Sequence, residues 1–288
     1  MNQRADSNST TTVLGATGKT GRRIAERLEG KGVAVRRASR SSEAAFDWDD
    51  RDTWAPAVAG STALYISYQP DLIVARALDD VAEIAALAQS HGVGRLVLLA
   101  GRGEPEALAA GAAVHETSMV TTVLSCAWFD QNFDEGAFAD EIATGSLTVP
   151  VGAVGEPFID ADDIADVAVE VLTGDPTRHD GATYELSGPR LLTFAEAAGE
   201  IGTAIGRPVE FTSVSLDDYR AILAQVGVPE PEVELFTKLF GTLFDGRNAH
   251  VSDGVEQVLG RPPRDFGEYV RRAAGSGAWS PSAAGVNR

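Results

Sequence analysis

Three glycines carry the first chemical signal in this sequence. Gly15, Gly18 and Gly21 stand in the run GATGKTG, directly after the apolar run 11–14 and directly before a helical pattern at 22–29. Glycines at this spacing, between a strand and a helix, let the chain turn tightly and let its backbone approach a pyrophosphate. The helix start offers free N–H groups and a partial positive charge. Rather than a plain tight turn, the pattern predicts a dinucleotide site formed by Gly15, Thr17, Gly18, Lys19, Thr20 and Gly21.

The same run also resembles the end of a nucleotide-hydrolase phosphate loop, because Gly18-Lys19-Thr20 matches its last three positions. That loop requires a glycine where this sequence has Val13, inside the predicted strand. No clear strand-terminal aspartate follows to hold Mg²⁺. We therefore do not expect nucleotide hydrolysis.

The residues that end the second predicted strand indicate which dinucleotide is bound. They read RRASRSS from Arg36 to Ser42, and no carboxylate appears before Glu43. An aspartate there would hold the ribose hydroxyls of NAD(H), whereas an arginine can fork onto the 2′-phosphate of NADP(H). The sequence therefore favours NADP(H) over NAD(H). We expect Arg40 to bind the phosphate, with Ser39 and Ser41 beside it, the alternative being a solvated basic strand end.

A scaffold of alternating strands and helices would position these residues. Short runs rich in Val and Leu predict strands at residues 11–14, 33–38, 64–67, 95–100 and 121–125. Helical patterns lie between them at residues 22–29, 73–90 and 104–116. Continuous apolar strands separated by helices are typical of a parallel sheet covered on both faces. We therefore predict an α/β fold with a Rossmann-like, doubly wound parallel sheet.

After Gly145 the pattern loosens into short strands and four helices. We predict an NAD(P)-binding domain at residues 11–145 and a smaller α+β substrate region at 146–274, packed on the sheet. The polar residues 1–10 are expected to be disordered. The tail 275–288, with only Trp279 to anchor it, is expected to be flexible.

Composition excludes several classes of function. The chain has 288 residues and a formal net charge of −18, which argues against binding to nucleic acid or to an anionic membrane surface. There is one cysteine, Cys126, and no apolar run long enough to span a membrane. The first ten residues have no apolar segment, so we do not expect them to be a secretory signal. We expect a soluble, cytoplasmic protein that binds a small molecule, with a homodimer or a protein partner left open.

Six segments, in order along the chain, resemble the NmrA-like group of atypical short-chain dehydrogenases/reductases. They are GATGKTG at 15–21, FDWDD at 46–50, LVLLAGRGE at 96–104, AWFDQNFDEG at 127–136, PFIDADDIADVAVEVL at 157–172 and LSGPRLLTFAEAA at 186–198. The resemblance covers most of residues 11–272 and implies an NAD(P) site at the carboxyl ends of the strands.

The resemblance also implies roles for single residues. Asp47 and Trp48 would border the adenine, although Trp48 could equally be a surface hydrophobe. Ser67 and Tyr68 would lie beside the ribose and nicotinamide. The ends of the next two strands would add Ala100, Gly101 and Cys126 to the cofactor site. The substrate pocket would be lined by Tyr68, Arg102, Trp128, Phe129 and Asn132.

The catalytic acid is not evident from the sequence. The Tyr-x-x-x-Lys pair of the better-known short-chain dehydrogenases is absent from the chain. Tyr68 and His115 remain candidates, with a pocket wall and a helix-surface histidine as their plain alternatives. Asp160, Asp162 and Asp163 precede a helix, where acidic residues cap the N-terminus, and we expect no metal site there.

These observations predict an NADP(H)-dependent oxidoreductase that passes hydride to a small electrophilic acceptor such as a quinone or an imine. Such acceptors need little acid catalysis from the protein. The alternative is a redox sensor without catalysis, which binds NADP(H) and reports its state to a protein partner. A third reading is a scaffold that has lost dinucleotide binding.

Overall fold

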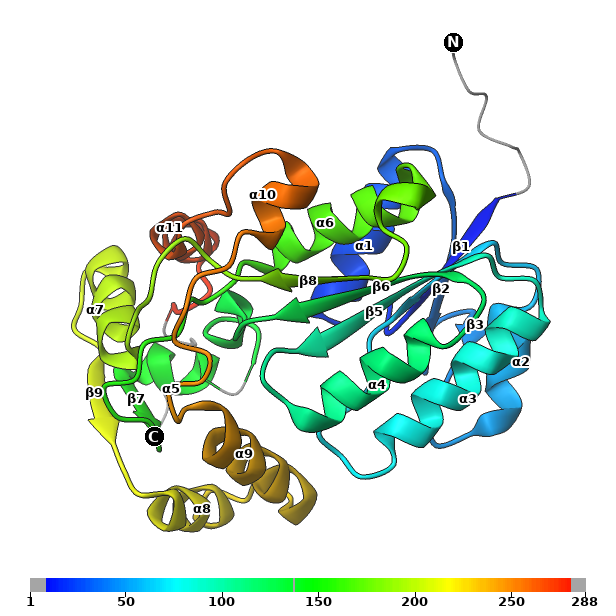
Figure 1. Cartoon of the computed structure of the whole chain (residues 1–288). Coiled ribbons are helices and arrows are strands. Elements are labelled where there is room, and N and C mark those ends of the chain that lie inside the picture. Colours follow the sequence, from blue (N-terminus) through cyan, green and yellow to red (C-terminus); the bar gives the residue numbers. More distant parts are fainter. Residues whose placement is uncertain (1–8, 137, 281–288) are drawn as a thin grey trace. The chain divides into compact units, whose positions relative to one another are not determined.

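The predicted strands lie in one seven-stranded sheet in the computed structural model, which describes residues 9–136 and 138–280 (Figure 1). All strand pairs in it are parallel, in the order β3-β2-β1-β4-β5-β6-β8. Their bounds are β1 Thr10–Leu14, β2 Ala34–Ser39, β3 Ala44–Ala45, β4 Ala63–Ile66, β5 Arg95–Gly101, β6 Val120–Cys126 and β8 Ala182–Leu186. The predicted doubly wound α/β fold is confirmed. The strand order reverses between β1 and β4, which is where such sheets bind ligands.

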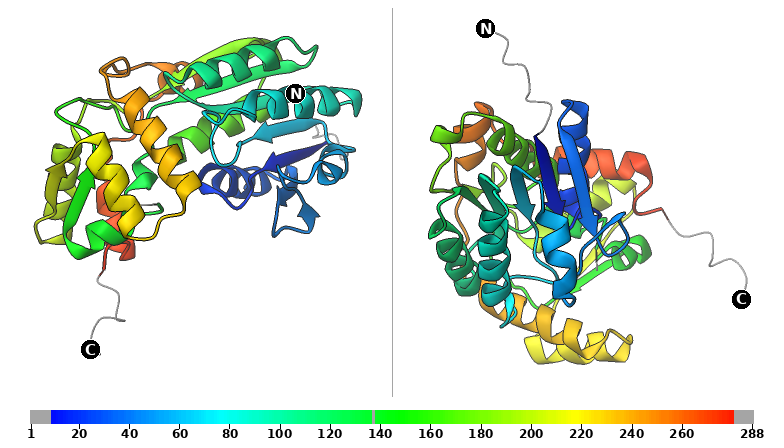
Figure 2. Two further views of the ribbon diagram at one scale, coloured as in Figure 1. Left: turned by 90° about the horizontal axis from the view of Figure 1, so that it is seen from below. Right: turned by 90° about the vertical axis from the view of Figure 1, so that its right-hand side faces the viewer.

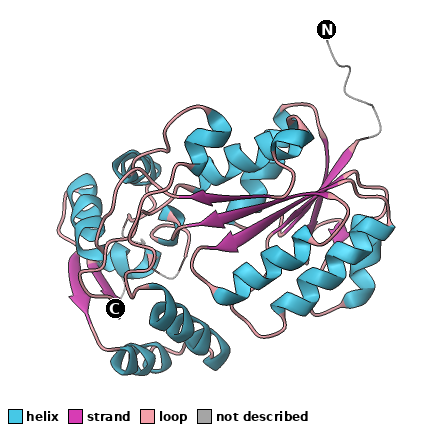
Figure 3. Ribbon diagram, in the orientation of Figure 1, coloured by secondary structure: helices cyan, strands magenta, loops and turns pink. Residues whose placement is uncertain are grey.

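Helices cover both faces of this sheet (Figure 3). On one face α1 packs against α6, and on the other α3 packs against α4, as both views of Figure 2 show. The helices that accompany the sheet are α1 Lys19–Gly30, α2 Trp54–Val58, α3 Ala77–Ser90, α4 Pro105–His115, α6 Ala161–Thr173 and α10 Gly254–Leu259. The 3₁₀ turns η1 Arg51–Thr53 and η3 Pro176–Arg178 complete this part. Apolar strands are thereby buried on both sides, as their sequences require.

The chain divides into two units, each made of segments that are separate in sequence. The sheet unit comprises the residues up to Cys126 together with Ala161–Leu186 and Asp253–Pro262. The helical unit comprises Ala127–Asp160, Ser187–Ser252 and the residues from Pro263 onward. The expected boundary between residues 145 and 146 does not match this division, because β8 pairs with β6 and α6 covers the sheet.

The helical unit has its own apolar core. Phe133, Phe158, Phe194 and Phe266 lie at its centre, each with an exposed fraction of 2% or less. Its elements are η2 Asp130–Asn132, α5 Ala139–Thr144, β7 Ser146–Val149, α7 Phe194–Ile205, β9 Glu210–Ser213, α8 Leu216–Gln225, α9 Glu230–Leu243 and α11 Phe266–Ser276. β7 and β9 form a parallel pair outside the main sheet.

The structure describes part of each chain end. Residues 1–8 and 281–288 lie outside the described residues, but β1 already begins at Thr10, and α11 runs into the expected tail as far as Ser276. Trp279 is buried, and its indole N–H donates to the Phe133 carbonyl at 2.7 Å. The expectation of a flexible tail from residue 275 is therefore wrong for residues 275–280. No helix in the described ranges 9–136 and 138–280 is long and apolar enough to cross a membrane.

Candidate dinucleotide site at the carboxyl edge of the sheet

The turn between β1 and α1 leaves little or no room for side chains at its three glycines. Gly15 has a φ of +74°, which favours glycine, and its N–H donates to the Ala38 carbonyl at 3.0 Å. A Cβ added at Gly21 would lie 2.2 Å from the Gly15 oxygen, and one at Gly18 would lie 3.2 Å from the same atom. A Cβ at Gly15 would meet the Ser67 oxygen at 3.3 Å. The glycines thus bring the start of α1 close to the ends of β1, β2 and β4.

The start of α1 is suited to an anion. Its N-cap is Gly18, which has no side chain to occupy the first N–H groups, and its first turn contains no acidic residue. The Thr20 side chain is held in place by β4, because the buried Tyr65 hydroxyl donates to Thr20 Oγ1 at 2.9 Å. Backbone N–H groups at a helix start bind phosphate groups through hydrogen bonds and the helix dipole. The cradle between Gly15 and Gly21 therefore fits a pyrophosphate.

The three arginines in and directly after β2 differ in what they bind. Arg36 donates to the Ala57 and Ala59 carbonyls, and Arg37 forms two hydrogen bonds with the Glu29 carboxylate, at 2.9 and 2.8 Å. Arg40 is exposed and forms no ion pair with any residue that the structure describes. Next to it, Ser39 is buried and Ser41 is exposed, with their hydroxyl oxygens 3.5 Å apart. Arg40 is thus the strand-end arginine whose guanidinium stays available to a phosphate.

The loop after β3 holds the two residues expected at the adenine. The Asp47 carboxylate accepts the Asp49 N–H at 3.1 Å, and its backbone carbonyl accepts the Trp54 indole N–H at 2.8 Å. Trp48 is buried, and its ring centroid lies 4.8 Å from that of Phe46 and 5.4 Å from that of Trp54. The alternative of a surface hydrophobe at Trp48 is therefore excluded. This aromatic cluster holds the loop in place.

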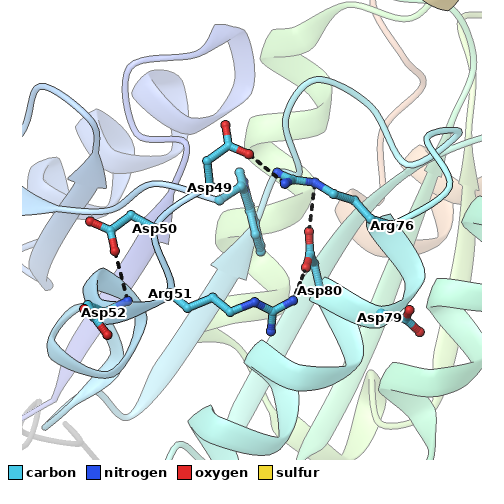
Figure 4. A pocket seen from close by; sticks show the side chains of 8 residues that line it. Asp49, Asp50, Arg51, Asp52, Arg76, Asp79 and Asp80 are labelled. Carbon is cyan, nitrogen blue, oxygen red and sulfur yellow. Dashed lines mark hydrogen bonds and ion pairs between the residues drawn. The ribbon is translucent and has the colours of Figure 1, made fainter.

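Tyr68, which follows β4, is held by a network that the sequence did not reveal. Its hydroxyl donates to Asp80 Oδ2 at 2.7 Å and accepts from Arg76 Nε at 3.1 Å. Asp80 Oδ1 accepts from Arg51 at 2.8 Å, while Arg76 also pairs with Asp49 at 2.6 Å (Figure 4). Burial and the hydrogen bond to Asp80 raise the pKa of the Tyr68 phenol to about 12. The proton of Tyr68 is therefore committed to Asp80 and is poorly placed to act as a catalytic acid.

A polar cavity of about 410 Å³ opens beside this network. It is lined by Trp48, Asp49, Asp50, Arg51, Asp52, Arg76, Asp79 and Asp80. One sequence signal could have indicated that Asp80 is buried and paired, although not with which loop. Asp80 is a charged residue within the apolar stripe of α3, between Ala77, Val81 and Ile84, and it stands four positions after Arg76.

The ends of β5 and β6 lie side by side in register. Gly101 is opposite Cys126, and the Arg102 N–H donates to the Cys126 carbonyl at 2.9 Å. Ala100 is buried, and a Cβ at Gly101 would collide with the Glu104 carboxylate. Burial raises the pKa of the Cys126 thiol far above its ordinary value, so this residue contributes a neutral surface. Arg102, expected in the substrate pocket, is buried, and its guanidinium lies 3.9 Å from the Glu185 carboxylate.

The remaining residues predicted for the substrate pocket belong to the helical unit. Trp128 is half-buried, and its ring lies 5.4 Å from that of Phe240 and 5.3 Å from that of Phe244. Its backbone N–H donates to Glu156 Oε1 at 3.0 Å. Phe129 forms a single β-bridge with Ile159, and Asn132 ends the turn η2. Within this unit Trp128 lies beside the rings of Phe240 and Phe244. Phe129 and Asn132 are placed by the backbone structure of the segment that follows β6.

His115 is at the wrong edge of the sheet for the predicted acid/base role. Its Nδ1 lies 2.8 Å from Thr121 Oγ1, and its Nε2 lies 3.2 Å from Thr183 Oγ1, both near the amino ends of their strands. From Thr121 to Cys126 the strand extends about 16 Å, at about 3.3 Å per residue. Ligands bind parallel sheets at the carboxyl ends of the strands. The interpretation of His115 as a residue that joins α4 to β6 and β8 is therefore favoured.

The aspartates near the start of α6 are bound to arginines. Asp160 accepts a hydrogen bond from Arg272, Asp162 accepts from Arg27 at 2.6 Å, and Asp163 lies 2.7 Å from Arg261. Within the described ranges, no group of three or more His, Cys, Asp or Glu side chains is arranged to hold a metal ion. Ion pairing therefore explains these carboxylates.

Comparison with known proteins shows that the chain is similar to oxidoreductases. The chain is 31% identical over 284 residues to an uncharacterized oxidoreductase, YesF, of Bacillus subtilis, an alignment that covers 93% of this chain and 96% of that protein. It is 34% identical over 166 residues, 57% of each chain, to an NAD(P)H azoreductase of Xenophilus azovorans. No family model matches the chain.

A solved structure shares the fold. Triphenylmethane reductase of Citrobacter sp., in complex with NADP(H), superposes with a TM-score of 0.71 at 21% sequence identity. The superposition covers 92% of this chain and 99% of that one. The fold described above is therefore also that of a reductase that binds NADP(H).

Proposed function

Because this chain belongs to the NmrA-like group of atypical short-chain dehydrogenases/reductases, we propose that it binds NADP(H) in preference to NAD(H) and reduces a small electrophilic acceptor. The observation that carries the proposal is the glycine turn with an unpaired arginine beside it. The Gly15 and Ala16 N–H groups both donate to the Ala38 carbonyl, two residues before Arg40. A pyrophosphate at the start of α1 and a 2′-phosphate at Arg40 would therefore be bound by neighbouring segments.

Bound NADPH would supply a hydride from its nicotinamide ring. The residues of this chain would bind and orient it, and they are poorly placed to deliver a proton. The Tyr68 proton is held by Asp80, the Cys126 thiol is buried, and His115 lies at the amino ends of the strands. A reaction that depends on proximity and orientation suits an acceptor that is already electron-poor, with the proton taken from water. Quinones, azo compounds and iminium ions belong to that class.

Two measurements test the proposal. Fluorescence titrations with NADPH and NADH should give a lower Kd for NADPH, because Arg40 can pair with its 2′-phosphate. The NADPH absorbance should then fall in the presence of at least one acceptor from a panel of quinones, azo dyes and cyclic imines.

Three other outcomes would contradict parts of the proposal. Tighter binding of NADH would overturn the cofactor preference. Tight NADPH binding without turnover of any acceptor would favour the redox sensor. Binding of neither dinucleotide would indicate a scaffold that has lost the cofactor.

A further inference from the structure

Asp80 is a buried carboxylate of α3 to which two other segments of the chain are joined. It lies in the first turn of α3, and only 2% of its surface is exposed. Its two oxygens bind the Tyr68 hydroxyl, which follows β4, the Arg51 guanidinium, which follows β3, and Arg76 at the start of α3. Figure 4 shows Arg51 and Arg76 reaching Asp80 from different sides.

The same group of residues fixes the loop after β3. Arg76 extends from Asp80 to Asp49 in that loop. Arg51 pairs with Glu83 as well as with Asp80, and its guanidinium lies 4.8 Å from the Trp54 ring. In addition, the Trp48 ring centroid lies 4.5 Å from that of Tyr68. Two kinds of interaction therefore connect the loop to Tyr68. One is the set of hydrogen bonds and ion pairs around Asp80, and the other is the contact between the Trp48 and Tyr68 rings.

These two segments lie on different sides of the point where the strand order reverses. The loop after β3 is on the side of β2 and β3, where the adenosine half of a dinucleotide binds, and Tyr68 follows β4 on the other side. We infer that Asp80 is a positioning residue that holds both segments in one arrangement, so that the two halves of the dinucleotide are bound by a single rigid edge. This inference rests on the proposed function.

The chain offers a matched control for this inference. Asp79 and Asp80 are adjacent in α3, carry the same charge and both line the polar cavity, but Asp79 is exposed and points away from the network (Figure 4). The Asp79 side chain forms no hydrogen bond or ion pair with any part of the chain that the structure describes. Asp79→Asn and Asp80→Asn therefore remove the same charge, and only the second variant disturbs the three segments.

The test is the dissociation constant of NADPH and of adenosine 2′,5′-bisphosphate, which contains the adenosine half alone. We expect Asp80→Asn to weaken NADPH binding about tenfold and the bisphosphate about threefold, because only the whole dinucleotide reaches both segments. Asp79→Asn should leave both constants within about twofold of wild type. A merely structural role for Asp80 would lower the number of binding sites and leave the dissociation constant of the folded fraction unchanged.

The inference is overturned if Asp80→Asn binds NADPH within about twofold of wild type, or if Asp79→Asn weakens it equally. Where Asp80→Asn does not fold, Arg76→Gln replaces it, since Arg76 is half-exposed and links Asp80 to Asp49. An unchanged NADPH constant in that variant also overturns the inference. Wild type that binds neither ligand overturns the proposed function, and the inference with it. Wild-type binding with an unaffected Asp80→Asn overturns the inference alone.

Discussion

The glycine turn and the Asp80 network lie at the same edge of the sheet, but different forces hold them. The turn is made of backbone, and its geometry depends on the absence of three Cβ atoms. The network is made of side chains, and its geometry depends on one buried carboxylate with a tyrosine and two arginines around it. Steric exclusion acts at every pH and salt concentration, whereas a charged network depends on both. Substitutions in the two regions should therefore affect stability and dinucleotide binding to different extents.

The largest effect is expected at Gly21. The Cβ of Gly21→Ala would lie 2.2 Å from the Gly15 oxygen, so the start of α1 must move away from the turn. We expect a loss of stability of about 3 kcal/mol and NADPH binding weakened roughly 100-fold or more. Calorimetric titration and thermal unfolding measure the two effects. Gly30→Ala is the control, because a Cβ there meets no atom within 4 Å. Equal behaviour of the two variants would contradict the steric account.

The second effect is expected at Arg40. Arg40→Ala should weaken NADPH binding about 10- to 100-fold and leave NADH unchanged, because a charge-assisted hydrogen bond to a phosphate contributes about 1.5–3 kcal/mol. Arg37→Ala is the control, since that arginine is held by Glu29. The measurement is the dissociation constant of NADH divided by that of NADPH, for each variant. If Arg37→Ala lowered this ratio and Arg40→Ala did not, the 2′-phosphate would bind elsewhere than at Arg40.

A smaller effect, on stability rather than on turnover, is expected at Tyr68. Tyr68→Phe removes a hydrogen bond to a charged group, so we expect the free energy of unfolding to fall by about 1.5–3 kcal/mol. Turnover of a quinone at saturating NADPH should stay within about twofold, because the phenol proton is held by Asp80 and is not used in the reaction. Denaturant titration and initial rates measure the two quantities. A 100-fold loss of turnover, in the range expected for a lost general acid, would identify Tyr68 as the acid.

The smallest effect is expected at His115, away from both regions. Burial lowers the pKa of His115 below its ordinary 6.5, so the folded protein binds this proton less readily than the unfolded chain does. The neutral histidine therefore supports the fold above about pH 6.5, and this contribution is lost as the pH falls through the folded pKa. His115→Gln should show a shallower loss of stability between about pH 7 and pH 5, with unchanged turnover. Denaturant midpoints at several pH values test this, and an identical pH dependence would refute it.

What could be predicted from the sequence was mostly local. The glycine turn and the position of Arg40 follow from residues within about 30 positions of one another, in a pattern with a known physical reason. The central strands were recognisable because they are buried on both faces and therefore continuously apolar.

The features that could not be predicted from the sequence depend on contacts between segments that are distant in the chain. β8 was predicted only as one of the short strands after Gly145, and not as a member of the main sheet. It lies at an edge of that sheet, where its residues alternate between half-buried and exposed, so its sequence does not resemble that of β5 or β6. The Asp80 network needs the loop after β3 to meet α3, and no local pattern specifies that meeting. The domain boundary was misplaced for the same reason, since pairing of β8 with β6 decides it.

The division into two interleaved units has a consequence for how the protein is made. The chain passes between the units five times, and the last segment of the sheet unit, Asp253–Pro262, contains α10, which packs on α6 and β8. During synthesis an N-terminal domain generally folds as soon as it has emerged from the ribosome. Here the sheet unit cannot be completed until residue 262 has been added. The edge at β3 is therefore complete early in synthesis, whereas the edge at β8 receives its neighbouring helix α10 only near the end. A chain stalled before α10 would leave β8 without that helix.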